Sequence, residues 1–352
     1  MARYLVTGGA GFIGCNYVHR LLARDDQVVV FDNLSRRGSR ANVAWLHAEH
    51  GDEALHVLVR DVRDAKALSE AVESVDVVVH LAGQTAVTTS VEDPRSDFEQ
   101  NALGTLNALE AARLSGASPV FLYASTNKVY GGMEDMKVIE KTTRYAYEDL
   151  PLGIPESQPL DFHSPYGCSK GAGDQYVRDY GRIYGLRTVV FRQSCIYGPR
   201  QMGVEDQGWV AWFIIAAVTG EPITIYGDGK QVRDVLYIED LLDVYDAAID
   251  GIDSVAGEIY NIGGGPMHTM SIWTEFRPIL EGLVGRAIPV SHRDWRPGDQ
   301  TIYVSDIRKA ARELGWQPET GVEEGLQRLF EWVAANRVLF LGDGDSGDRV
   351  GK

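Results

Sequence analysis

Two side chains capable of acid–base chemistry stand four residues apart in the segment YGCSK, at Tyr166 and Lys170. On a helix this spacing places both side chains on one face. A tyrosine ordinarily ionises at about pH 10, and a neighbouring positive charge lowers the pKa of the phenol. Such a phenolate could take a hydroxyl proton while a hydride leaves the same carbon. We therefore expect Tyr166 to be a base.

The same spacing recurs at Tyr226 and Lys230, in YGDGK. That segment is a Gly-rich turn, which does not form a stable helix, whereas Tyr166 follows a proline and opens a long helical pattern. A further polar group, Ser125 or Thr126, follows a buried strand, at the end where ligands bind in parallel sheets. Either hydroxyl could bond the reacting hydroxyl group; alternatively, both simply cap the strand.

Glycines stand at positions 8, 9, 11 and 14 in TGGAGFIG, between an apolar run and a helical pattern. Such a tight turn lets the backbone approach a pyrophosphate, and the following helix offers free N–H groups. Asp32 ends the next apolar run, 18 positions after Gly14, close to the expected spacing of about 20. Its carboxylate would bond ribose hydroxyls and repel a 2′-phosphate, which favours NAD over NADP. Arg36 and Arg37 favour NADP if they bind that phosphate; otherwise they are solvated loop charges or adenine contacts.

Alternating strands and helices must position these groups. Short β-branched runs at 3–7, 27–31, 54–59, 75–81, 120–124 and 187–192 alternate with helical patterns, including 11–23, 65–72, 94–115 and 167–184. This rhythm predicts an α/β fold with a doubly wound parallel (Rossmann) sheet and a smaller C-terminal substrate-binding part. We expect an NAD-binding domain over 1–192, with 230–262 returning to the sheet through a last strand at 258–262. The substrate-binding part covers 193–229 and 263–337, and 338–352 is a flexible tail.

The composition excludes several classes of protein. The 352 residues carry a formal net charge of −16, and such a surface repels nucleic acid and anionic membranes. The three cysteines lack CxxC spacing, so we expect no metal site and a reducing compartment. The N-terminus has no signal-peptide pattern, and the longest apolar run, 209–218, is about half a bilayer span. We therefore expect a cytoplasmic protein without nucleic acid or membrane partners.

Taken together, these motifs resemble the extended short-chain dehydrogenase/reductase family. The resemblance includes TGGAGFIG, HLAG at 80–83, STNKVYG at 125–131, YGCSK, RDVLYIEDL at 233–241 and RPGD at 296–299, and it extends to about residue 337. It implies that Thr126 relays a proton, Tyr166 is the base and Lys170 binds the nicotinamide ribose. The NAD contacts that it implies are Gly8, Gly11, Phe12, Ile13, Gly14, Asp32, Asn33, Asp61, Val62, Leu81, Ala82, Gly83, Asn101, Tyr166 and Lys170, and we add Arg36 because it follows the second apolar run.

For the substrate, the predicted contacts are Gln84, Thr126, Gln193, Arg233 and Arg296. The two arginines are expected at the diphosphate and nucleotide, because a guanidinium fork matches phosphate oxygens. The alternative for each arginine is a surface salt bridge.

Several stretches resemble the branch of the family that inverts C2 of CDP-linked hexoses. These are FDNLSRRG at 31–38, HLAGQTAVTTS at 80–90, LDFHSPYGCSKG at 160–171, DQGWV at 206–210 and GKQVRDVL at 229–236. The resemblance implies an epimerase that holds NAD tightly, oxidises C2 transiently and regenerates NAD in each turnover. It also implies a homodimer formed through the helices near 96–115 and 167–184, although core packing would explain the same apolar pattern.

Two positions depart from relatives within the family. Sugar-nucleotide 4,6-dehydratases have an Asp-Glu pair after the position of Thr126, where this chain has Asn127 and Lys128, so water elimination lacks its general acid. Relatives often have asparagine at the position of Cys195, and a cysteine cannot supply that amide. Gln193 or Ser194 could substitute for it.

Two other functions are consistent with parts of this pattern. One is a UDP-sugar 4-epimerase or another member acting at C4, with the same fold and cofactor. The other is a non-catalytic NAD sensor or scaffold, which predicts a broken Tyr-Lys pair, whereas here the pair is intact.

Overall fold

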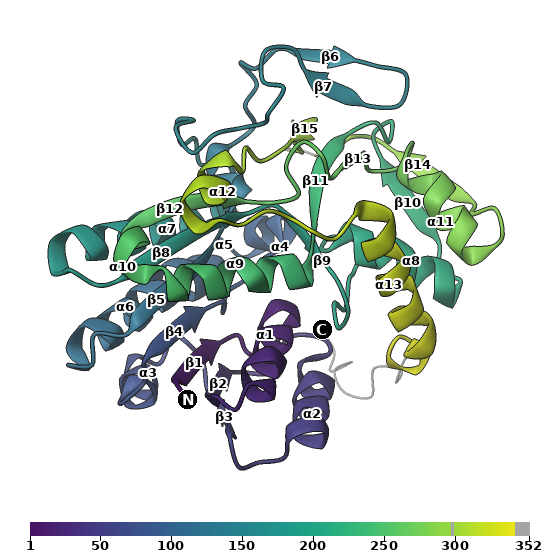
Figure 1. Cartoon of the computed structure of the whole chain (residues 1–352). Coiled ribbons are helices and arrows are strands. Elements are labelled where there is room, and N and C mark those ends of the chain that lie inside the picture. Colours follow the sequence, from purple (N-terminus) through teal and green to yellow (C-terminus); the bar gives the residue numbers. More distant parts are fainter. Residues whose placement is uncertain (297–298, 342–352) are drawn as a thin grey trace.

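The computed structural model describes residues 1–296 and 299–341 (Figure 1). Its main sheet has seven strands in the order β12-β8-β5-β4-β1-β2-β3, and every neighbouring pair is parallel. The strands are β1 (Arg3–Thr7), β2 (Gln27–Asp32), β3 (Leu55–Val59), β4 (Val77–His80), β5 (Val120–Thr126), β8 (Thr188–Gln193) and β12 (Glu258–Ile262). This arrangement confirms the predicted doubly wound parallel sheet.

Burial on both faces explains why the strands are continuous apolar runs. In β5, Val120 and Leu122 pack into the core on one face of the sheet, while Phe121 and Tyr123 pack into the core on the other. A strand buried on both faces has no solvent-facing positions that need polar residues.

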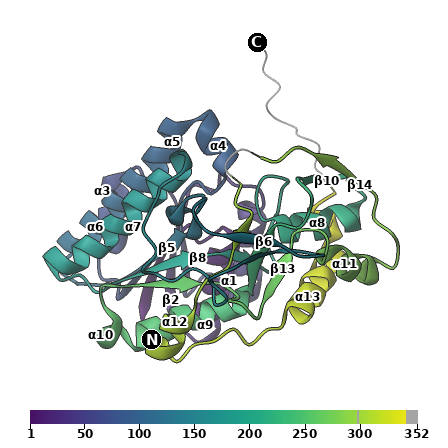
Figure 2. The ribbon, with the colours of Figure 1, turned by 90° about the horizontal axis from the view of Figure 1, so that it is seen from above.

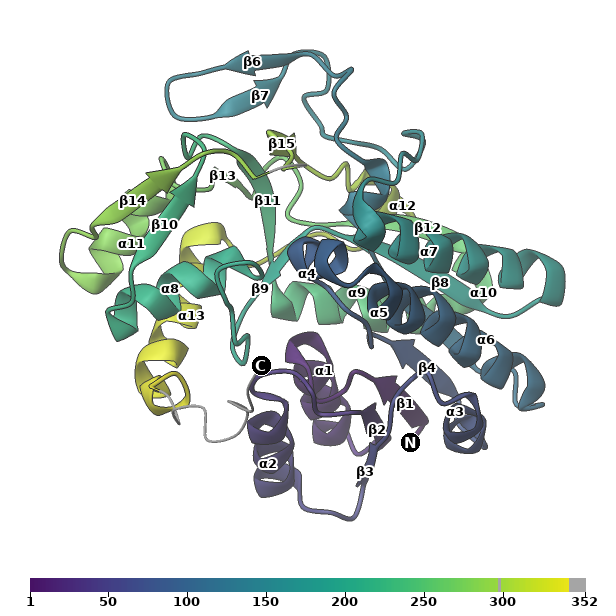
Figure 3. The same ribbon diagram turned by 180° about the vertical axis from the view of Figure 1, so that it is seen from behind.

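Helices cover the two faces of this sheet (Figure 2). One layer contains α1 (Phe12–Ala23), α2 (Ser39–His50), α9 (Ile238–Asp250) and α10 (Ile252–Val255). The other layer contains α3 (Ala65–Val72), α4 (Val87–Glu92), α5 (Pro94–Phe98), α6 (Gly104–Leu114) and α7 (Ser164–Tyr184). The helices α4, α5 and α6 pack against α7 and form an outer surface of the molecule (Figure 3).

The predicted helix at 94–115 is helical along its length but not uniformly α-helical. A π-helical segment, Glu99–Leu103, separates α5 from α6. Within it, the buried Asn101 amide donates to Asp97 and to Ser169 of α7, at 3.0 and 3.1 Å. Such π turns occur frequently at functional sites, and hydrophobic periodicity alone does not reveal them.

The remaining strands form smaller sheets beside the main one. A four-stranded sheet joins β9 (Cys195–Tyr197), β11 (Val232–Tyr237), β13 (Thr269–Ser271) and β15 (Ile302–Tyr303), and β10 (Ile223–Tyr226) pairs with β14 (Val290–Arg293). Around them pack α8 (Trp209–Thr219), α11 (Phe276–Val284), α12 (Arg308–Leu314) and α13 (Val322–Ala335). Within segment 230–262, β12 joins the main sheet and α9 and α10 cover it, whereas β11 pairs within the second sheet.

A hairpin of β6 (Val138–Glu140) and β7 (Tyr145–Tyr147) was not predicted (Figure 3). It lies within the expected NAD-binding domain, yet the Tyr147 hydroxyl donates to the carbonyl oxygen of Ile302, in β15, at 2.9 Å. A single connected core also joins the main sheet to α8 and α13. The division into an NAD-binding domain and a substrate-binding part therefore stays a prediction about which residues bind which ligand.

The predicted tail is only partly covered by the structure. Residues Arg337–Leu339 form a 3-10 turn, and the buried Phe340 packs edge-on against Trp332 of α13. Val338 and Leu341 are exposed, and residues 342–352 lie outside the described residues, so the flexible tail stays a prediction. Across residues 1–296 and 299–341, no helix has the length and apolar character needed to cross a membrane.

Candidate active site

A cavity of about 360 Å³ opens at the carboxyl ends of the central strands. Five of the residues that line it stand at or just after the ends of these strands: Gly8 after β1, Asp32 at the end of β2, Leu81 after β4, Ser125 one residue before the end of β5, and Gln193 at the end of β8. Because β1 pairs with both β2 and β4, the chain reverses its winding direction there. In sheets of this kind, ligands bind at that reversal.

The glycine turn provides the floor of the cavity. A Cβ atom on Gly14 would lie 2.2 Å from the carbonyl oxygen of Gly8, and one on Gly8, whose φ is +70°, would lie 2.8 Å from the Ala82 nitrogen. Only glycine fits both positions. The helix α1 starts at Phe12 with no acidic side chain in its first turn. Its free N–H groups and positive dipole end suit a pyrophosphate.

The acidic end of the cavity is built from the ends of β2 and β3. Asp32 accepts hydrogen bonds from the backbone N–H groups of Leu34 and Ala10, at 2.8 and 3.1 Å. Burial raises the pKa of Asp32, and these hydrogen bonds and Arg36 oppose that shift. Beside it, the Asn33 amide donates to Asp61 at 3.0 Å.

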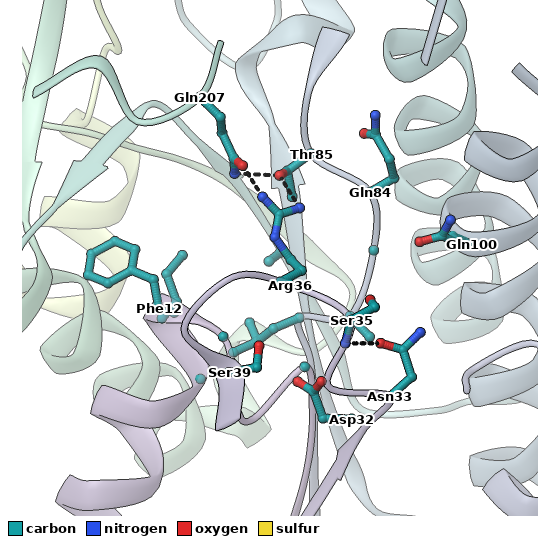
Figure 4. Close-up of a pocket in the computed structure, with 18 of the residues that line it drawn as sticks. Phe12, Asp32, Asn33, Ser35, Arg36, Ser39, Gln84, Thr85, Gln100 and Gln207 are labelled. Atoms are coloured by element: carbon teal, nitrogen blue, oxygen red, sulfur yellow. Dashed lines mark hydrogen bonds between the residues drawn. The ribbon is translucent and has the colours of Figure 1, made fainter. Parts of the chain in front are cut away.

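Arg36, although exposed, reaches across the cavity toward Thr85 and Gln207 (Figure 4). Its guanidinium donates to the Thr85 hydroxyl at 3.0 Å and to the amide oxygen of Gln207, and the Gln207 amide donates to Thr85. Arg37 donates to the carbonyl oxygen of Phe340 at 3.5 Å.

Tyr166 and Lys170 both line the cavity from the first turns of α7. The Lys170 ammonium donates to the Ala124 carbonyl oxygen at 2.5 Å and lies 4.3 Å from the centre of the Tyr123 ring. Burial lowers the pKa of Lys170 to about 7, against the influence of Asp174 and Asp97.

The direction of the Tyr166 pKa differs from our expectation. In the protein alone, burial raises the pKa of Tyr166, while a hydrogen bond with Thr126 and the charge of Arg36 act to lower it. The Lys170 ammonium donates to a backbone carbonyl oxygen and not to the Tyr166 phenol. Desolvation therefore remains the largest influence on the pKa of Tyr166.

The structure separates the two hydroxyl candidates on β5. Ser125 donates to the buried carboxylate of Asp174 at 2.7 Å, and Asp174 also pairs with Arg192 at 2.8 Å. Ser125 is therefore part of a buried network between α7 and β8, whereas Thr126 interacts with Tyr166.

The second Tyr-x-x-x-Lys pair is not a site of the same kind. Tyr226 ends the strand β10 and its hydroxyl donates to Glu205 at 3.1 Å, while Lys230 pairs with Glu140 at 2.6 Å.

Most predicted contacts lie together, and a few lie apart. All predicted NAD contacts except Asn101 line the cavity, as do Gln84 and Gln193 among the substrate contacts. Asn101 lies behind Gly83, where a Cβ atom would come within 2.4 Å of its Oδ1. Among the described residues that buried oxygen has no hydrogen-bond partner, as is also true of Oε1 of Gln84.

The two predicted diphosphate ligands lie outside the cavity lining. Arg233 pairs with Asp299 at 2.7 Å, and Arg296 pairs with Asp206 at 2.8 Å, its guanidinium 4.0 Å from the centre of the Tyr226 ring. In the protein alone, Arg296 thus makes the surface salt bridge that we considered as the alternative, whereas the salt bridge of Arg233 is largely buried.

Ser194 and Gln193 are the two residues that could replace the asparagine that relatives have at the position of Cys195. The Ser194 hydroxyl donates to the carboxylate of Asp234 and is committed there. The Gln193 amide donates to the Tyr245 hydroxyl at 2.5 Å, and Gln193 still lines the cavity.

Several lining residues were not predicted. They come from the loops after β2, β3, β4 and β9, from the start of α2 and from the π-helical segment, and they are Ser35, Ser39, Asn42, Arg60, Thr85, Gln100, Arg200, Gln201, Met202, Gly203, Gln207 and Gly208. The DQGWV segment offered a signal for Gln207 and Gly208, but a single sequence does not show that this loop reaches a cavity formed by the N-terminal strands.

Comparison with known proteins gives a consistent result. Residues 4–263 match the model of the NAD dependent epimerase/dehydratase family. The chain is 43% identical to the CDP-paratose 2-epimerase of Salmonella typhi over 95% of this chain and 99% of that protein.

Two solved structures are similar over nearly the whole chain. A dTDP-glucose 4,6-dehydratase from Streptomyces venezuelae with NAD bound has a TM-score of 0.81 and 32% identity, covering 96% of this chain and 98% of that one. A UDP-glucose 4-epimerase from Thermotoga maritima with UDP-glucose has a TM-score of 0.80 and 30% identity, covering 95% and 99%.

Proposed function

The chain belongs to the NAD dependent epimerase/dehydratase family and is an NAD-dependent sugar-nucleotide epimerase, and we propose that it inverts C2 of a CDP-linked hexose. The observation that carries the proposal is the 43% identity to a CDP-paratose 2-epimerase over 95% of the chain. The substrate class is a CDP-hexose of the CDP-paratose or CDP-tyvelose type.

The cavity fits NAD. Gly8, Gly11 and Gly14 leave room for a pyrophosphate at the N-terminus of α1, and Asp32 is placed to bond the adenosine ribose. When bound, NAD supplies the chemistry of accepting a hydride from a sugar carbon and returning it to the opposite face.

In the proposed reaction, Tyr166 takes the proton of the C2 hydroxyl, and Thr126, whose influence acts to lower the pKa of Tyr166, relays it. Lys170, fixed by the Ala124 carbonyl, holds the nicotinamide ribose. Gln84 and Gln193 line the cavity. The Gln84 amide nitrogen donates to the Ala86 carbonyl oxygen at 2.6 Å, so its amide oxygen, which has no partner among the described residues, is the group placed to accept a hydrogen bond from a sugar hydroxyl. Tyr166 then returns the proton after the sugar has turned.

We also propose that NAD stays bound between turnovers, because the reaction regenerates it. The bridge of Arg36, Thr85 and Gln207 supports this proposal, since it joins loops after β2 and β4 to the loop before α8 across the cavity (Figure 4).

An elimination reaction is less well supported. Neither Asn127 nor Lys128, which follow Thr126, carries the carboxylic acid that protonates a leaving hydroxyl group. Arg36 is a permanent cation and cannot supply that proton.

We further propose a homodimer formed through the surface of α4 to α7. This surface exposes a group of large apolar side chains, namely Val91, Phe98, Leu103, Leu114, Tyr176, Ile183 and Tyr184. Contiguous exposed apolar residues on a soluble protein mark interaction surfaces, and a two-fold dimer buries the same patch on both copies.

The experiment that tests the function supplies CDP-glucose and UDP-glucose separately to the purified holoenzyme. NMR of the products distinguishes inversion at C2, which gives CDP-mannose, from inversion at C4, which gives UDP-galactose. The proposal predicts CDP-mannose. Formation of UDP-galactose without any change at C2 of CDP-glucose would contradict it and favour the 4-epimerase.

A further inference from the structure

Lys128 connects the Tyr166–Thr126 pair to the second sheet. It is in the 3-10 turn Asn127–Tyr130 that follows β5, and its backbone N–H donates to the Thr126 hydroxyl oxygen at 3.2 Å. At the other end of its side chain, the ammonium donates to the amide oxygen of Gln300 at 3.2 Å. Gln300 is itself buried and donates to the carbonyl oxygen of Gly131. Lys128 is therefore held both at its backbone and at the ammonium end of its side chain.

The charged groups that act on Lys128 include one other cation and one carboxylate, so positive charge is in excess. Arg233 and Asp299 both act on its pKa, and Asp299 already pairs with Arg233 at 2.7 Å. Within residues 1–296 and 299–341, Lys128 forms no salt bridge of its own. Burial, followed by the charge of Arg233, lowers the pKa of Lys128 to about 8.

A partly buried ammonium without a carboxylate is costly, unless a ligand supplies the negative charge. The protein as a whole has a formal net charge of −16, so two cations, Lys128 and Arg233, with one carboxylate, Asp299, between their influences form a local exception. Their arrangement suits a doubly charged diphosphate better than a neutral sugar hydroxyl.

We propose that Lys128 binds the β-phosphate of the substrate and so places C2, rather than C4, beside Tyr166 and Thr126. This inference rests on the proposed function, and it names Lys128 as the residue that determines which sugar carbon is inverted. In a sugar nucleotide, C1 carries the β-phosphate and C2 is the adjacent carbon, whereas C4 lies across the ring. A cation held two residues from Thr126 therefore meets the phosphate only when the C2 end of the ring faces the hydroxyl pair.

A second anion could occupy the same place. A hexuronic acid carries a carboxylate on C5, next to C4, so Lys128 would equally suit a C4-acting enzyme with an acidic sugar. The shared chemistry is an anionic oxygen one carbon from the reacting carbon, and the experiment must distinguish the two sources.

The test compares nucleoside diphosphates with monophosphates in the NAD-loaded protein. Calorimetry gives the Kd of CDP, CMP, UDP and UMP for the unmodified protein, Lys128→Met, Lys128→Arg and the control Lys230→Met, which removes only a surface salt bridge. We expect Lys128→Met to weaken both diphosphates about tenfold or more while leaving the monophosphates within about twofold, since one charge-assisted hydrogen bond is lost. Lys128→Arg should retain most of the diphosphate preference.

A diphosphate-to-monophosphate ratio that is unchanged in Lys128→Met overturns the inference, as does an equal loss for all four nucleotides, which indicates a structural role. Binding of UDP-glucuronic acid and UDP-glucose to the Tyr166→Phe protein, with and without Lys128→Met, tests the second source. A loss confined to UDP-glucuronic acid assigns Lys128 to the sugar carboxylate and also overturns the inference.

These outcomes are distinguishable from failure of the proposed function. If the unmodified protein inverts C2 of CDP-glucose but the ratio does not change in Lys128→Met, only the role of Lys128 is wrong. If C2 is not inverted and the ratio still falls, Lys128 binds the phosphate but does not select C2, so its proposed role in choosing the carbon is overturned together with the proposed function.

Discussion

Tyr166 and Lys170 leave the same face of α7 but have different surroundings. The Lys170 ammonium is held by a backbone carbonyl, while the Tyr166 phenol faces the cavity and interacts with Thr126. This division suits a lysine that positions a ribose and a tyrosine that exchanges a proton.

The clearest residue-scale prediction is the effect of Tyr166→Phe. Without the phenolic oxygen, epimerase turnover should fall by about 10²-fold or more, because general base catalysis contributes at least that much. The NAD content of the purified protein, measured after denaturation, should not change. Tyr184→Phe, on the exposed end of the same helix, is the control. If Tyr166→Phe keeps more than about a tenth of the turnover, another group is the base.

A second residue-scale prediction concerns His80, a buried link between the elements beneath the cavity. Its Nδ1 lies 2.7 Å from the Thr7 hydroxyl of β1, and its Nε2 lies 3.1 Å from the Thr105 hydroxyl of α6. Burial lowers the pKa of His80 from 6.5 to about 3, and Lys170 adds to this shift. The unfolded chain therefore binds a proton below pH 6.5 that the folded protein does not bind until about pH 3.

From this difference, stability should be lost as the pH falls through that window, with a contribution from His80 of up to about 1.4 kcal/mol per pH unit. His80→Asn does not titrate, so its free energy of unfolding should fall less steeply between pH 6.5 and 4.5. Urea unfolding at several pH values measures both slopes, and His56→Asn, at an exposed position of β3, is the control. Equal slopes for His80→Asn and the unmodified protein would show that His80 is not held neutral.

Sequence reasoning identified residues whose roles depend on local patterns. Gly8, Gly14, Asp32, Tyr166 and Lys170 were predicted because turn, strand and helix periodicity place them. The bridge of Arg36, Thr85 and Gln207 could not be predicted, because it joins loops that are far apart in the sequence. The raised pKa of Tyr166 was also missed, since the extent of burial is a property of the folded protein.

At the scale of elements, the turn between β1 and α1 is the most constrained feature of the site. Gly14→Ala would force a Cβ atom against the Gly8 carbonyl oxygen, a separation of 2.2 Å without movement. We expect a loss of about 1–3 kcal/mol in the free energy of unfolding, as for other overpacked sites, and a marked loss of bound NAD.

Gly282→Ala is the matched control for this substitution. Gly282 lies in α11, and a Cβ atom there would meet nothing within 4 Å. That substitution should stabilise the helix by roughly 0.5–1 kcal/mol and leave the NAD content unchanged. An NAD content that survives Gly14→Ala would contradict the assignment of this turn to the pyrophosphate.

The elements that were predicted well are those with strong local patterns. The apolar runs became the strands of the main sheet, including β12, which joins it from the C-terminal half. The strand β11 is equally apolar, but its partners β9, β13 and β15 determine that it lies in another sheet. The π-helical segment Glu99–Leu103 depends on buried contacts of Asn101 that helical periodicity does not encode.

At the scale of the whole molecule, the surface of α4 to α7 predicts the oligomeric state. If two copies bury this surface, Tyr176→Asp should place two charges in the interface and convert a dimer to a monomer. Light scattering after gel filtration measures the mass. Met267→Asp, at another highly exposed apolar position, should leave the dimer intact. A monomeric unmodified protein, or a Tyr176→Asp protein that remains dimeric, would contradict this interface.

The central claim is that the sugar carbon C2 loses a hydride and regains the same one. The most direct measurement follows the sugar protons by NMR while the holoenzyme acts on CDP-glucose in deuterated water. The account predicts a CDP-mannose signal whose C2 proton is retained, because the hydride does not exchange with solvent between its removal and its return. Replacement of the C2 proton by deuterium during turnover would contradict the account, since it would require that C2 loses a proton.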